Sequence, residues 1–283
     1  MQAAVEDAVN RAQSYADALR RGRNGEAIAL LNSPGDSSDL KFWLPLVQAW
    51  DAAERRDAAT AVTLLGQVPK SSALAAFVDE ESALILLKLG RGADAESYAR
   101  RAIAKAGPRE YRLRLALAAG YSALGDRARA AAMIEGIEDN AEDLRRAAQS
   151  GELKRMQIDS AAEAFSEQLV ALAIEMRRSN PRSAPVNILQ LARFAAPDNS
   201  SALLFLGTTL DDVGRTDDAI AIFRSIRADD PLYPDALDAQ VRTLSEAERF
   251  GEALAVANAA AQSRSASSDD HARLADVYSA MDR

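Results

Sequence analysis

A short phrase recurs along this chain at nearly constant spacing. The stretches LGRGADAESYA (89–99), LGDRARAAAMI (124–134) and VGRTDDAIAIF (213–223) place a small residue at the same point. Six copies of the phrase carry alanine there: Ala27, Ala61, Ala95, Ala130, Ala219 and Ala253. The successive spacings are 34, 34, 35, 89 and 34 residues. A period near 34 is the length of one helix–turn–helix unit of a solenoid, so the spacing predicts an array of antiparallel helix pairs.

Each copy also predicts a turn and a packing face. The predicted turn lies five residues before the alanine, at Gly22, Arg56, Gly90, Gly125, Gly214 and Glu248. Glycine there supplies the left-handed conformation that ends a helix at little cost. Four residues after the alanine, most copies carry a larger apolar residue on the same helical face. These residues are Leu31, Leu65, Ile134 and Phe223, with Ala99 and Ala257 as small exceptions.

The clearest unit spans residues 200–233. Its pattern consists of Leu203, Leu206, Gly207, Leu210, Gly214, Ala219, Phe223 and Pro231. This pattern resembles the tetratricopeptide repeat (TPR). The resemblance implies an all-α, right-handed α-solenoid of antiparallel helix pairs with about 7–8 units. More loosely, the chain resembles a family of secreted alphaproteobacterial TPR proteins, which slightly favours the bacterial periplasm or secretion over the cytoplasm.

The spacing of 89 residues contains a degenerate unit and an insertion. Residues 166–199 read as one more helix pair, with Pro185 at the alanine position. Residues 139–159 are largely polar and predict an irregular insertion or a short extra helix that bends or interrupts the superhelix. The expected organisation is an N-terminal array over 1–138, this insertion, and a C-terminal array over 160–283. That array ends in a half repeat, as expected of a chain cut from a longer protein.

Composition narrows the possible functions. The net charge of −8 argues against sequence-independent binding to nucleic acid or anionic lipid. No apolar run approaches the roughly 18–20 residues that span a bilayer, and the first residues lack the pattern of a signal peptide. The chain has no cysteine, and His271 is its only histidine. No phosphate-binding or dinucleotide-binding glycine motif occurs. We therefore expect no enzyme activity, no cofactor and no metal site.

By the resemblance, positions 2, 5, 9 and 12 of each unit line a concave face formed by the first helices. The apolar candidates for partner binding are Trp43, Leu46, Trp50, Phe77 and Leu84. Aromatic residues in such a groove can anchor a peptide or helix, but both tryptophans could instead pack against neighbouring helices. The C-terminal stripe is acidic and contains Asp211, Asp235, Asp238, Asp269 and Asp276, with Arg242 among them. It suits a basic or amphipathic ligand, although a solvated face remains the alternative.

The sequence therefore predicts a non-enzymatic scaffold that binds a protein or peptide through its concave face. One alternative is a glycan- or polymer-binding module of the bacterial envelope, with Trp43 and Trp50 as stacking platforms. Another is a non-catalytic arm of an enzyme that lies outside these residues. The Lys and Asn pattern of TPR domains that clamp a chaperone's C-terminal carboxylate is absent from positions 5 and 9, so no such clamp is expected. The sequence leaves the oligomeric state open.

Overall fold

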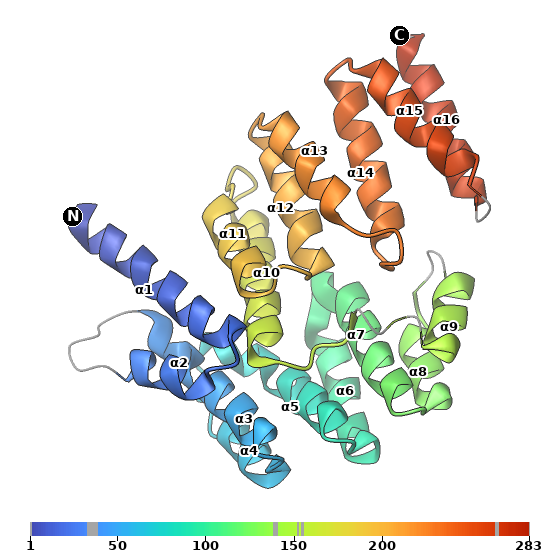
Figure 1. Cartoon of the computed structure of the whole chain (residues 1–283). Coiled ribbons are helices and arrows are strands. Elements are labelled where there is room, and N and C mark those ends of the chain that lie inside the picture. The colour runs from blue at the N-terminus through green and yellow to red at the C-terminus, as the bar shows by residue number, and fades with distance from the viewer. Residues whose placement is uncertain are drawn as a thin grey trace. The chain divides into compact units, whose positions relative to one another are not determined.

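The computed structural model describes residues 2–32, 39–137, 141–151, 153, 156–263 and 266–282. Among these residues the secondary structure is helical and no strand occurs. The chain forms two compact units: residues 1–171 with 191–197, and residues 172–190 with 198–283. We call them the N-terminal unit and the C-terminal unit. The fold is an all-α solenoid of antiparallel helix pairs, as the repeat predicts (Figure 1).

The N-terminal unit contains four complete helix pairs and one additional helix among its described residues. They are α1 (Gln2–Arg20) with α2 (Asn24–Leu31), α3 (Leu44–Glu54) with α4 (Ala58–Gly66), α5 (Val78–Lys88) with α6 (Gly92–Ala106), and α7 (Glu110–Ala123) with α8 (Arg127–Ile134), followed by α9 (Ala141–Ser150). Short 3-10 helices precede three of the first helices: η1 (Asp39–Trp43), η2 (Ala73–Phe77) and η3 (Gly107–Arg109). The next pair, α10 (Ala161–Ser179) and α11 (Val186–Ala195), is divided between the two units.

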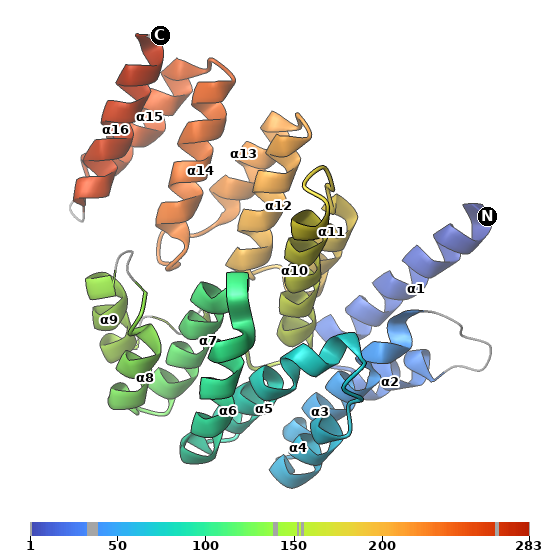
Figure 2. The same ribbon diagram turned by 180° about the vertical axis from the view of Figure 1, so that it is seen from behind.

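The C-terminal unit continues the same arrangement. It contains α12 (Ser200–Asp212) with α13 (Thr216–Ser225), α14 (Tyr233–Glu246) with α15 (Phe250–Ala261), and the single helix α16 (Ser268–Met281). Both views show α14, α15 and α16 side by side (Figures 1 and 2). Ile220, Val241, Leu244 and Val277 pack together in the core of this unit with Ala253 and Ala257.

The turns within the helix pairs share one hydrogen-bond pattern. All six predicted turn residues have positive φ angles, and the two that are not glycine, Arg56 and Glu248, have φ of 60° and 58°. In each turn, the N–H of the following residue donates to the carbonyl five residues earlier, at 2.8–3.0 Å. The N–H of the turn residue itself donates to the carbonyl three residues earlier, at 2.8–3.0 Å. Together the two hydrogen bonds satisfy carbonyls that the last helical turn leaves free. The six turns predicted from the repeat are therefore confirmed.

The alanine positions lie where paired helices approach each other. All six repeat alanines have 0% of their surface exposed. The approach is equally close at Gly207 in α12, where an added Cβ would lie 2.4 Å from the Phe223 ring of α13. Small residues at these points let the backbones approach and let larger neighbours such as Phe223 fill the remaining space.

The insertion contains a helix and several buried apolar residues. Helix α9 is the predicted short extra helix, and it packs against α7 and α8. The insertion as a whole is not a polar surface segment, because Leu144, Ala148, Leu153, Met156 and Ile158 are all buried. These described residues belong to the N-terminal unit, and the division between the units falls within α10, away from the boundaries expected at 138 and 160.

Candidate functional site

The first helices of the two units differ in accessibility. In the N-terminal unit, four of the five apolar candidates have at most 3% of their surface exposed: Trp43, Leu46, Trp50 and Leu84. Phe77 is half-buried. A partner cannot reach these four buried side chains without displacing what covers them. The same burial leaves neither tryptophan ring exposed as a stacking platform for a glycan.

The groove of the N-terminal unit is filled by the chain itself. We call residues 156–171, which include the first half of α10, the closing segment. Its Phe165 ring has no exposed surface and lies between two aromatic rings. The Tyr15 ring is 4.9 Å away at an interplanar angle of 88°, and the Trp43 ring is 5.1 Å away at 85°. Both edge-to-face arrangements are of the kind that aromatic pairs prefer. Trp43 therefore packs against a helix of its own chain and not against a helix of a binding partner.

Glu81 of α5 forms the polar centre of this contact. Its Oε2 accepts a hydrogen bond from Trp50 Nε1 at 2.8 Å, and its Oε1 accepts one from Gln168 Nε2 at 2.7 Å. Glu81 is 1% exposed. Burial, together with the nearby charge of Glu80, raises the pKa of Glu81 to about 8, while the two hydrogen bonds oppose the shift. The carboxyl group is therefore largely protonated at neutral pH.

The amide of Gln168 suits a protonated Glu81. As placed, Gln168 Oε1 is buried without a hydrogen-bond partner. The orientation of an amide group is assigned from its hydrogen-bond network, because its O and N atoms are nearly indistinguishable. Rotating this amide by 180° would turn Oε1 toward Glu81, where it could accept the carboxyl proton. The neutral carboxyl would then donate to Gln168 Oε1, a hydrogen bond that an ionised Glu81 cannot form.

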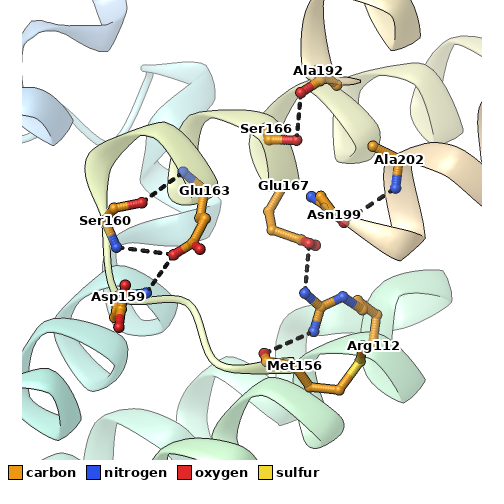
Figure 3. Close-up of polar contacts among 10 residues, drawn as sticks. All are labelled: Arg112, Met156, Asp159, Ser160, Glu163, Ser166, Glu167, Ala192, Asn199 and Ala202. Atoms are coloured by element: carbon orange, nitrogen blue, oxygen red, sulfur yellow. Dashed lines mark hydrogen bonds and ion pairs between the residues drawn. The ribbon is translucent and has the colours of Figure 1, made fainter. Parts of the chain in front are cut away.

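Arg112 of α7 holds the closing segment at a second point (Figure 3). Its Nη2 lies 2.7 Å from Glu167 Oε1, and its Nη1 donates to the Met156 carbonyl at 3.3 Å. The side chains of Arg112 and Glu167 are 16% and 10% exposed, so water screens this ion pair little. Arg112 thereby connects the irregular start of the closing segment to its helix.

The same close-up shows how the helix of the closing segment begins (Figure 3). Glu163 Oε2 accepts from the N–H groups of Asp159 and Ser160 at 2.8 and 3.1 Å, and Ser160 Oγ accepts from the Glu163 N–H. This reciprocal capping box fixes the start of α10. Lys88 of α5 donates to the Asp159 carbonyl, which adds another contact between the groove and the segment.

Glu80, next to Glu81, is held by a separate partner. Its Oε2 lies 2.7 Å from Arg109 Nη1, and the Arg109 guanidinium lies 4.4 Å from the centre of the Phe77 ring. Burial raises the pKa of Glu80, whereas the charge of Arg109 lowers it. Phe77 thus supports an internal ion pair, which accounts for its partial burial.

The C-terminal unit leaves its acidic stripe more accessible. The side chain of Asp238 is 59% exposed, although its Oδ1 accepts from the buried Arg273 at 2.5 Å. Arg273 also pairs with Asp270 at 2.6 Å, so it positions two acids from the inside. Asp211 is half-buried and accepts from Thr243 Oγ1 at 2.7 Å. Arg242, Asp269 and Asp276 are exposed.

Among the residues that the structure describes, no group of three or more His, Asp or Glu side chains could hold a metal ion. His271 lies exposed on α16. No described helix is long and apolar enough to cross a membrane.

The repeat pattern did not predict that the closing segment fills the groove. Its burial could have been inferred only from the apolar residues in and just before it, which are Leu153, Met156, Ile158 and the Phe165–Leu169 face. Trp43, Trp50 and Glu80 occupy positions of the predicted stripe, and they take part in these contacts or in the adjoining ion pair.

No protein-family model matches this sequence, and no curated protein matches it. The solved structures with a similar chain path include the TPR2AB domain of yeast Sti1, described as a complex with pHSP90. It is 15% identical, covers 87% of this chain and 100% of its own, and has a TM-score of 0.36. The TPR domain of P58(IPK) is 16% identical, covers 97% of this chain and 79% of its own, and has a TM-score of 0.33.

The chain is TPR-like. That assignment rests on its own geometry: six equivalent turns, six buried alanines and a period near 34 residues. Identities and TM-scores as low as these carry no information about partners. Support for partner binding therefore comes from the residues on the accessible and filled faces of this chain.

Proposed function

We propose that this TPR-like protein is a non-enzymatic interaction scaffold whose C-terminal unit binds a protein or peptide along the first-helix face of α12, α14 and α16. One observation carries the proposal: Asp238, Arg242, Asp269 and Asp276 remain exposed on this face, while the corresponding face of the N-terminal unit is filled by its own chain. The first helices also carry the residues that differ between repeats, whereas the second helices carry the shared packing residues.

The charge of this face favours a basic or amphipathic helical ligand. Charge complementarity increases the association rate and selects among partners more than it adds affinity. Arg242 within an acidic stripe adds selectivity, because a uniformly basic partner would oppose it. Binding should weaken as the ionic strength increases, since the charged groups are exposed to solvent.

The proposal is tested with a synthetic Lys- and Leu-containing amphipathic peptide whose binding to the full chain is measured by fluorescence anisotropy. We expect a variant with Asp238→Asn and Asp276→Asn to lower the affinity by at least about fivefold. The matched control carries Asp217→Asn and Asp218→Asn on α13, removes the same charge from a second helix, and should leave the affinity unchanged. Equal losses in both variants would show that only net charge matters and would contradict a site on the first helices.

A further inference from the structure

We propose that the first-helix face of the N-terminal unit is a second, helix-binding groove, closed in this structure by the chain's own residues 156–171, and that a partner helix with the same side-chain pattern competes for it. The pattern is an aromatic residue, an acid two positions later and a glutamine one position after that, as in Phe165, Glu167 and Gln168. This groove is separate from the accessible face to which the proposed function assigns partner binding.

An aromatic socket provides the first element of recognition. Tyr15 of α1 and Trp43, which directly precedes α3, contribute the two rings that enclose Phe165 at 4.9 and 5.1 Å. Phe165 and Tyr15 have no exposed surface, and Trp43 has 3%. Desolvated aromatic anchors of this kind supply much of the energy of helix-in-groove recognition.

Two polar contacts provide the specificity. Arg112 of α7 pairs with Glu167, and Glu81 of α5 bonds to Gln168. A ligand without the acid would leave the Arg112 guanidinium poorly paired, and a ligand without the amide would leave the Glu81 carboxyl without its partner. Buried groups left unpaired penalise a wrong ligand more strongly than a missing apolar group does.

The contacts extend over the whole groove. Side chains of α1, α5 and α7, and Trp43 directly before α3, contact one continuous segment. They lie at the stripe positions of successive first helices or next to them. A solenoid holds an extended ligand in this way, with one contact per repeat. The segment that fills the groove thus has the same geometry and chemistry that a ligand from another chain would need.

Covalent linkage explains why the groove is closed. A linked segment acts at an effective concentration on the order of millimolar, so a free helix with the same contacts competes poorly. Weakening the chain's own segment should therefore increase the affinity for an added one.

The experiment uses the full chain and a dye-labelled peptide with the sequence of residues 156–171. The variant Phe165→Ala with Gln168→Ala weakens the closing segment without changing the groove. We expect the peptide to bind this variant at least tenfold more tightly than it binds the unaltered chain. A control peptide carrying Phe165→Ala should bind the variant at least tenfold more weakly than the original peptide.

A second variant, Glu167→Ala with Gln168→Ala, keeps the aromatic anchor. The same peptide-binding measurement is made on this variant if the first variant does not melt cooperatively. The proposal is overturned if a folded variant binds neither peptide, or binds both equally. Dimerisation of a folded variant without peptide binding would assign the groove to a second copy of this chain, and would overturn the proposal of a separate partner.

Discussion

At the residue scale, ionisation of the buried Glu81 carboxyl opposes folding. Its pKa lies near 8 in the folded chain and at 4.5 in an exposed reference. Between these values the folded chain keeps a proton that the unfolded chain releases. The stability contributed by this proton is complete below pH 4.5 and decreases as the pH rises through 8.

We therefore predict that Glu81→Gln reduces the loss of stability between pH 5 and pH 8. The unaltered chain should lose on the order of 4 kcal/mol across this range through Glu81. Glutamine keeps the acceptor for Trp50 and can donate to a rotated Gln168, but it cannot ionise. Urea denaturation at several pH values measures the effect, with the exposed Glu246→Gln as the control. Parallel pH profiles for Glu81→Gln and the unaltered chain would contradict the assigned pKa.

The two turns without glycine provide a second prediction at this scale. Arg56 and Glu248 adopt φ angles of 60° and 58°, which strain any residue with a Cβ atom. Arg56→Gly and Glu248→Gly should each stabilise the chain by about 0.5–1 kcal/mol. The neighbouring Arg55→Gly and Ala247→Gly are matched controls, because these residues have negative φ and gain nothing from glycine. Thermal melting of the four variants measures the effect. The melting temperature should rise for each turn variant and fall for its neighbouring control, and changes of the same sign within a pair would argue against strain.

At the element scale, the packing of each helix pair depends on its small alanine. Ala219 of α13 has no exposed surface, and it lies where α12 and α13 pack closely. Ala219→Asp should lower the free energy of unfolding by at least about 3 kcal/mol, because it buries a charge without a partner. Ala221 is exposed on the same helix, so Ala221→Asp is the control. An unchanged denaturation midpoint for Ala219→Asp would invalidate the repeat register.

Local spacing explains why the helix pairs could be predicted. A turn at position −5 and an apolar residue at position +4 are constraints within one pair, so they identified even Arg56 and Glu248 as turn residues. The closing segment depends instead on contacts between residues far apart in the sequence, such as Trp43 with Phe165 and Glu81 with Gln168. No periodicity encodes that pairing. The repeat pattern therefore predicted a first-helix face, and it could not reveal that a distant segment of the chain fills that face.

At the scale of the whole molecule, the first-helix faces of the two units differ in accessibility. One is filled by the closing segment, which contacts the buried Glu81 carboxyl, and the other carries exposed charges of mostly one sign. Repeat arrays are stabilised mainly by neighbouring units, so local stability can differ along one chain. The burial of α5 and α7, where residues 80–87 and 115–121 are all buried, predicts that these helices are the most protected part of the N-terminal unit.

Hydrogen exchange tests whether stability is local. Val277 of α16 is fully buried in the core that α14 and α15 share. Val277→Ala should therefore increase the exchange of α15 and α16 amides and leave α5 and α7 nearly unchanged, because nearest-neighbour terms weaken over several repeats. Leu117→Ala in α7 removes a side chain with 0% exposure and should produce the converse pattern. If either variant accelerates exchange uniformly, the chain unfolds as one cooperative unit, and opening the groove would then require global unfolding.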